Sequence, residues 1–123
     1  MRVSDLIALE IERQGMSQQM AAALCGMTRQ RLWDILDKRN PHFRTVERIM
    51  AGLGYAIVLE KKTDFFDPKD QAAFLETCRT ENPMFDSLVR ILDAVGYELL
   101  FVKTSGDGAG KTLTAILQDT GKL

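Results

Sequence analysis

The stretch Ser17–Leu36, SQQMAAALCGMTRQRLWDIL, decides the fold expected for this chain. Its apolar residues recur at helical spacing and predict two short helices, at about 18–24 and 28–36. Ser17 and Thr28 precede these two runs, and both are residues whose hydroxyl groups cap helix N-termini. The stretch therefore predicts two helices separated by a tight turn.

The first of these helices is rich in small residues. Met20, Ala21 and Leu24 fall at helical spacing and are expected to form its buried stripe. Gly26 follows and can adopt the left-handed conformation that ends a helix. A small-residue helix that is crossed by a polar helix through a short glycine turn is the helix-turn-helix pattern.

The second helix has an apolar and a polar side. The residues expected to face inward are Leu32, Ile35 and Leu36. The residues expected to face outward are Arg29, Gln30, Arg31, Trp33 and Asp34. The polar side lies in a basic part of the chain, because Arg29–Arg48 holds six basic and three acidic residues. Such a local basic patch favours a polyanionic partner, although the whole chain has a net charge of −1.

The composition excludes several classes of protein. No run of about 18 apolar residues predicts a membrane span, and the N-terminus lacks the pattern of a signal peptide, so we expect a cytoplasmic protein. Cys25 and Cys78 are expected to be reduced, buried thiols. His42 has no cysteine or histidine cluster near it, so we expect no metal site and no cofactor. No Ser/His/Asp or Cys/His set and no paired carboxylates suggest an enzyme.

Four short motifs in the first half follow one another at fixed spacing. They are Ser17-Gln18 before Met20-Ala21, then Gly26-Met27-Thr28, Arg39-Asn40-Pro41 and Leu53-Gly54-Tyr55. With these motifs, the chain resembles the phage-repressor-like (XRE) helix-turn-helix family. The resemblance implies a lambda-repressor-like DNA-binding domain over residues 1–62, ending in a strand at 55–59. Antitoxin-type regulators of this family pair such a strand across a two-fold axis, so the resemblance also implies a homodimer.

An internal repeat links the two halves of the chain. Residues 40–61, NPHFRTVERIMAGLGYAIVLEK, align with residues 82–103, NPMFDSLVRILDAVGYELLFVK, and eight of 22 positions are identical. Both copies predict a helix, a glycine cap, a tyrosine and a strand. The strands at 55–61 and 97–103 can pair within the chain or across a dimer, and a lone strand would leave its backbone groups unpaired. We hypothesise that the repeat arose by duplication.

The second half, residues 63–123, is expected to be a helix-strand region for dimerisation and packing. Asp67-Pro68 predicts a helix start. The glycine-rich loop SGDGAGKT at 105–112 lacks the first glycine of a phosphate-binding loop. Leu113–Leu117 is expected to return as a third strand. The fold class is therefore mainly α with a small β-sheet: a helix-turn-helix domain followed by a helix-strand repeat.

In the helix-turn-helix interpretation, the second helix enters the major groove of double-stranded DNA. The residues expected to read bases are Thr28, Arg29, Gln30, Trp33 and Asp34. Those expected to contact phosphates are Gln18, Arg31, Lys38, Arg39 and Arg44. Two roles stay open. Asp34 either accepts a hydrogen bond from cytosine or orients an arginine, and Trp33 either packs on the protein or contacts sugar or a thymine methyl group.

The function expected from these residues is a sequence-specific DNA-binding transcriptional regulator, a repressor that acts as a homodimer. The alternative is an antitoxin-type interaction module. The motivation for this alternative is charge, because residues 63–123 carry a balance of −4 that suits the masking of a toxin.

Overall fold

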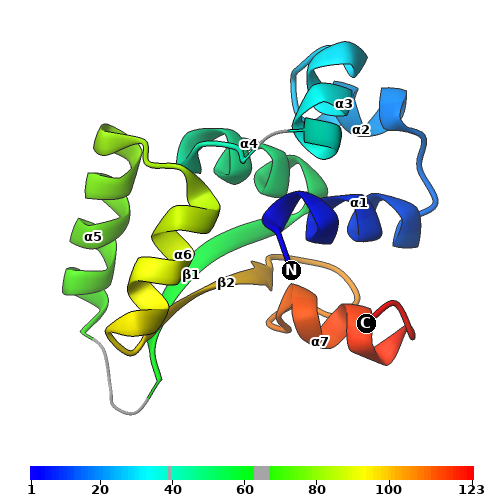
Figure 1. The fold of residues 1–123 in the computed structure, drawn as a ribbon. Coiled ribbons are helices and arrows are strands. Elements are labelled where there is room, and N and C mark those ends of the chain that lie inside the picture. The colour runs from blue at the N-terminus through cyan, green and yellow to red at the C-terminus, as the bar shows by residue number, and fades with distance from the viewer. Residues whose placement is uncertain (39, 63–66) are drawn as a thin grey trace.

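The computed structural model describes residues 1–38, 40–62 and 67–123. This part of the chain is mainly helical, with a small two-stranded antiparallel sheet (Figure 1). The elements in chain order are α1 (Val3–Arg13), α2 (Gln18–Leu24), α3 (Arg29–Lys38), α4 (Phe43–Leu53), β1 (Tyr55–Lys61), α5 (Pro68–Glu81), α6 (Phe85–Ala94), β2 (Tyr97–Lys103) and α7 (Leu113–Asp119).

Several helices begin and end where the local sequence predicts. The side chains of Ser17, Thr28 and Asp67 each accept a hydrogen bond from a backbone N–H two or three residues later, at 3.2, 3.1 and 2.8 Å. These bonds satisfy backbone donors that have no partner inside the helix. At the other end of a helix, Gly54 stops α4 in the left-handed conformation, with φ at 99°. Short-range signals are therefore sufficient to place these boundaries.

The two strands of the repeat pair with each other inside the chain. β1 and β2 run antiparallel, with Tyr55 opposite Lys103, Val58 opposite Leu100, and Lys61 opposite Tyr97. Of the two pairings that the sequence left open, the structure has the intrachain one. Because Val58 and Leu100 occupy the same place in the two copies, the strands are related by a local two-fold axis through this pair.

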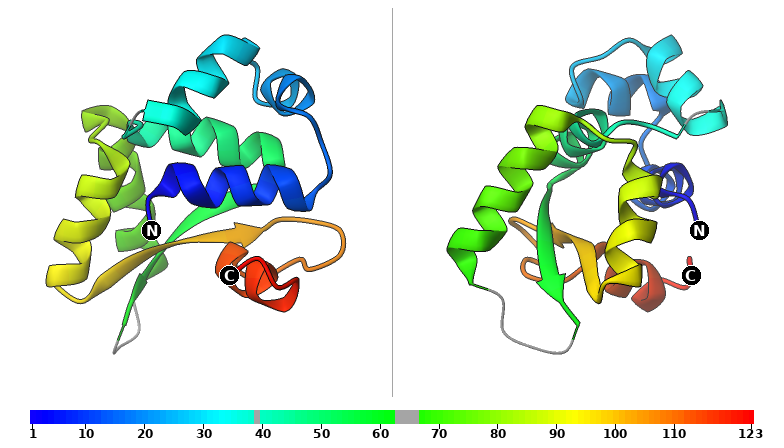
Figure 2. Two further views of the ribbon diagram at one scale, coloured as in Figure 1. Left: turned by 45° about the vertical axis from the view of Figure 1, so that its right-hand side comes forward. Right: turned by 60° about the vertical axis from the view of Figure 1, so that its left-hand side comes forward.

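The buried residues of both halves form one hydrophobic cluster. α1 and α4 lie together on one side of the paired strands, and α7 lies beside β2 (Figure 2). Two hydrogen bonds join α1 to the second half: the backbone N–H of Val3 donates to Asp86 Oδ1 at 3.0 Å, and Lys122 donates to Glu12 at 2.9 Å. The expected boundary near residue 62 thus does not separate two cores.

The expected buried stripe of α2 is wrong by one position. Met20 and Leu24 are 59% and 57% exposed, whereas Ala21 and Ala22 are buried. α2 packs on α4 near Gly52, where an added Cβ would lie 2.9 Å from the carbonyl oxygen of Leu24. An approach this close admits small side chains only, so the larger apolar residues lie on the outside.

The expected third strand at Leu113–Leu117 is also wrong, because this segment belongs to helix α7. Thr112 caps that helix, since its Oγ1 accepts a hydrogen bond from the backbone N–H of Ala115 at 3.2 Å. Leu113, Ile116 and Leu117 are buried. The spacing 113, 116, 117 is helical and not alternating, and it buries one side of a helix against β2 and α1.

Candidate nucleic-acid interface

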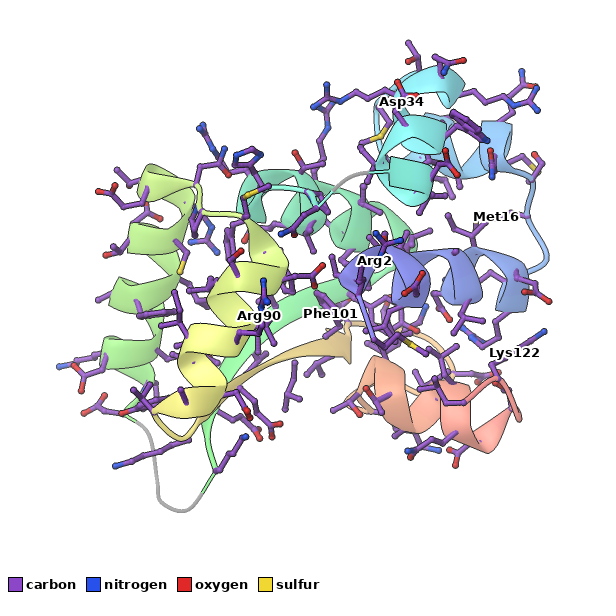
Figure 3. The ribbon with its side chains drawn as sticks, in the orientation of Figure 1. Arg2, Met16, Asp34, Arg90, Phe101 and Lys122 are labelled. Atoms are coloured by element: carbon purple, nitrogen blue, oxygen red, sulfur yellow. The ribbon has the colours of Figure 1, made fainter. Side chains whose placement is uncertain are left out.

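α3 separates its polar and apolar sides as the sequence predicted. Leu32 and Ile35 are buried in the core, and Leu36 is packed against it. The outward candidates Thr28, Arg29, Gln30, Arg31 and Trp33 are exposed, and Asp34 is half-buried. Figure 3 shows Asp34 on α3, at the top of the view and away from the strands. The helix therefore offers one continuous polar surface to an incoming partner.

Two of the base-reading candidates are joined to each other. The Nε2 of Gln30 donates to Asp34 Oδ1 at 3.1 Å, across one turn of α3. Among the described residues, the partner of the Asp34 carboxylate is Gln30, and both roles considered for Asp34 stay predictions. To bind adenine through both of its amide groups, Gln30 would have to release Asp34.

Trp33 lies beside the first residues of α3. It is 42% exposed, and it lines an open hollow together with Arg29 and Gln30. An arginine, an amide and an indole in one shallow surface combine a cation, hydrogen-bonding groups and an apolar plane. Such a set suits the edges and faces of bases and sugars.

The phosphate candidates are spread around this surface. Arg31 and Arg44 are exposed, and Gln18 is half-buried at the start of α2. Arg39 and the side chain of Lys38 lie outside the described residues. A second open groove runs from α3 to the start of α4, and its lining residues are Arg31, Asp34, Ile35, Asn40, Pro41, His42, Thr45 and Met84.

Arg48 holds the turn between α2 and α3. The sequence predicts no role for this residue beyond its place in the basic patch. The Nε of Arg48 donates to the carbonyl of Cys25 at 2.9 Å, and its Nη2 donates to the carbonyl of Gly26. Gly26 has φ at 68°, and an added Cβ would lie 2.8 Å from the guanidinium. A cation at the C-terminus of α2 offsets the negative end of the helix. No local sequence signal distinguishes this arginine from a phosphate-binding one.

A buried carboxylate that no local pattern predicts joins α1 to β1. Glu10 accepts hydrogen bonds from Arg13 at 2.6 and 2.8 Å, from Gln14 at 2.7 Å, and from the Tyr55 hydroxyl at 2.6 Å. Burial raises the pKa of Glu10, but the hydrogen bonds outweigh burial and hold that pKa below its ordinary value. This cluster stabilises the fold beneath the candidate interface.

Reactive side chains are sparse in the described part of the chain. Cys25 and Cys78 are buried and unbridged, and burial raises the pKa of both thiols. A raised pKa keeps a thiol protonated and chemically inert. In residues 1–38, 40–62 and 67–123, no three His, Cys, Asp or Glu side chains form a group that could hold a metal ion.

Comparisons with known proteins add no relative. No family model matches the chain, and no curated protein and no solved structure is significantly similar to it. None of the described helices is both long enough and apolar enough to cross a lipid bilayer.

Proposed function

We propose that this protein is a sequence-specific regulator that binds double-stranded DNA, with α3 as the helix that enters the major groove. The observation that carries the proposal is the joint exposure of Arg29, Gln30 and Arg31 on a helix whose other side, Leu32 and Ile35, is buried. A helix anchored in this way presents polar groups on a rigid support, which base reading requires.

The reading chemistry follows from the side chains. The major groove is about 12 Å wide and admits one α-helix. Arg29 can donate two parallel hydrogen bonds to guanine. Gln30 can also form two hydrogen bonds with adenine, donating one and accepting the other. Asp34, once released by Gln30, can accept from the amino group of cytosine. Specificity would then depend on exchanging one intramolecular hydrogen bond for contacts with bases.

Affinity would come from the surrounding cations. Arg31 lines the groove between α3 and the start of α4, and Arg44 is exposed on the first turn of α4. Contacts with phosphates do not depend on base sequence, but they weaken as salt rises, because binding releases counterions from the DNA. We place Gln18, Lys38 and Arg39 in the same phosphate-binding role by their positions in the sequence.

Selection of bound fragments from a random DNA pool tests the proposal. Arg29→Ala should weaken binding to the selected sequence by roughly 1–3 kcal/mol and relax the preference at one base position. Arg44→Ala should weaken binding to all sequences about equally and lower the salt slope by about one. The matched control is Arg90→Ala, which removes an exposed arginine from α6 (Figure 3). Equal losses for Arg29→Ala and Arg90→Ala would refute reading by α3.

A second candidate function is an antitoxin-type module that binds a protein partner. The observation that favours it is the apolar surface of α6, where Ile91 and Val95 are 64% and 62% exposed. Ile91→Asp should abolish binding to the product of a co-transcribed neighbouring gene, yet leave DNA affinity unchanged. A partner that still binds this variant would exclude α6 as the contact.

A further inference from the structure

The contacts that join the two copies of the repeat are reciprocal. The backbone N–H of Phe43 donates to the carbonyl of Pro83 at 2.7 Å, and the N–H of Phe85 donates to the carbonyl of Pro41 at 2.8 Å. Each of these bonds is the image of the other under an offset of 42 residues. The rings of Phe43 and Phe85 stack between them, with centroids 6.1 Å apart.

The asparagine that opens each copy caps the helix of the other copy. Asn82 Oδ1 accepts a hydrogen bond from the backbone of Arg44 at 2.9 Å, and Asn40 Oδ1 accepts one from the backbone of Asp86 at 3.3 Å. The exchange of caps extends the two-fold relation from the strands to the starts of α4 and α6. This is the isologous contact of a symmetric dimer, in which residue i meets j and j meets i, here closed within one chain.

The two copies differ in what precedes them. Copy one follows α2 and α3, whereas copy two follows α5, which ends at Glu81. α5 packs on copy one, where Arg79 forms an ion pair with Glu47 at 2.9 Å. The internal axis therefore relates two packing units. In the described part of the chain, a candidate reading helix precedes the first unit and not the second.

Resting on the proposed function, we propose that the internal axis takes the place of a two-fold axis between chains. The DNA-binding unit is then a single chain, which reads one site without palindromic symmetry. β2 pairs with one edge of β1 over the full register from Tyr55 to Lys61. In the homodimer that the resemblance implied, a strand of a second chain would be the partner of this strand.

A single reading helix has consequences for the DNA site. Dimeric helix-turn-helix regulators bind two half-sites about one helical turn apart. Their sites are palindromic because the protein dimer is two-fold symmetric. One chain with one reading helix needs only one half-site, contacted in one major groove. We expect a selected motif with no inverted repeat, bound by one chain per duplex.

The first experiment measures mass and motif. Sedimentation equilibrium of the full chain, over a wide range of concentration and then with a selected duplex, should give one chain free and one chain per duplex. A dimer in solution, two chains per duplex, or a palindromic motif would overturn the inference and leave DNA reading intact. If no DNA is selected, the proposed function fails, and the mass of the free chain still decides whether the axis is internal.

The second experiment asks which chain supplies β2. The double variant Val58→Cys, Leu100→Cys places two thiols directly opposite each other across the strand pair. Mild oxidation should give a cross-linked monomer on a non-reducing gel. A cross-linked dimer would show that the strands are exchanged between chains, which would overturn the inference. The single variant Val58→Cys is the control for nonspecific cross-linking.

Discussion

Ile49 on α4 has no exposed surface, whereas Ile91, which holds the same place in the second copy of the repeat, is 64% exposed. The next turn shows the same contrast, because Leu53 is 3% exposed and its equivalent Val95 is 62% exposed. The local sequence and backbone are alike in both copies. The difference shows that burial at these positions depends on the helices that cover them. α1 and α2 both pack on α4, whereas α1 contacts α6 at its first turn, where the backbone N–H of Val3 donates to Asp86.

The arginines before these isoleucines diverge in the same way. Arg48 donates to the carbonyls at the end of α2, whereas Arg90 is exposed on α6. The same residue type thus supports the turn before the candidate reading helix in copy one and makes no comparable contact in copy two, within the part of the chain that the structure describes. The same substitution made in both copies tests whether the neighbouring elements cause these differences.

The largest difference is expected for the isoleucines. Ile49→Ala should lower the free energy of unfolding by about 2–5 kcal/mol, because it leaves a cavity in the core. Ile91→Ala should change it by no more than about 0.5 kcal/mol, because the side chain is largely in solvent. Urea denaturation of both variants measures this. Similar losses would mean that α6 is covered in solution.

A smaller effect is expected at the tyrosines. Tyr55→Phe removes one donor from buried Glu10 and should destabilise the fold by about 1–3 kcal/mol. Tyr97→Phe in copy two is the control and should cost less, because this residue is only half-buried. Urea titrations at neutral pH compare the two, and equal costs would contradict a special role for the carboxylate.

Acid should act through the same carboxylate. The folded pKa of Glu10 is lowered, so its contribution to stability is present above the unfolded pKa of about 4.3 and is lost as pH falls through the folded pKa. Tyr55→Phe should raise that folded pKa and so weaken the loss of stability on acidification. Unfolding midpoints measured across the acidic range check the sign, and an unchanged acid profile in the variant would refute it.

A still smaller effect on stability is expected at the arginines. Arg48→Ala should cost about 1 kcal/mol, because it removes two hydrogen bonds and a favourable charge at the end of α2. It should also weaken DNA binding, since the turn before α3 loses its support. Arg90→Ala should change neither quantity. Thermal unfolding and DNA titration distinguish the variants. Normal DNA affinity for Arg48→Ala would show that DNA binding by α3 does not depend on the turn that Arg48 supports.

The smallest difference is expected at the glycines before the strands. Gly54 and Gly96 have φ at 99° and 87°, so alanine at either position adopts a left-handed conformation at a cost of about 1–2 kcal/mol. The two costs should agree within about 0.5 kcal/mol, because the left-handed conformation is shared and the flexible end of Lys103, 2.9 Å from an added Cβ at Gly54, can move aside. Paired denaturation curves test this, and a large disagreement would show that the copies differ even in their backbone.

The sequence predicted much of the local structure of the candidate site. Thr28 caps α3, and the division of α3 into an exposed side and a buried side is as expected. Capping and helical periodicity act over a few residues, so they are readable without a fold. The hydrogen bond between Gln30 and Asp34 spans four residues, but its formation depends on rotamers that a sequence does not specify.

Errors arose where a distant segment decides the outcome. The sequence predicted Met20 and Leu24 in the apolar stripe of α2. Gly52, which has no side chain, lets α2 approach α4 so closely that only small side chains fit between them. The bond between Glu10 and Tyr55 joins residues 45 positions apart. The sequence around either residue of such a contact does not indicate which distant residue it will meet.

Local sequence patterns predicted where several helices begin, where glycines end them, which side of α3 is apolar, and that residues 40–61 recur at 82–103. Only the tertiary structure decided that the two copies pair inside one chain and that equivalent residues have unequal burial. The physical reason is range. Capping, φ preference and periodicity act within one turn of the chain, whereas burial and strand pairing depend on which distant element supplies the other surface.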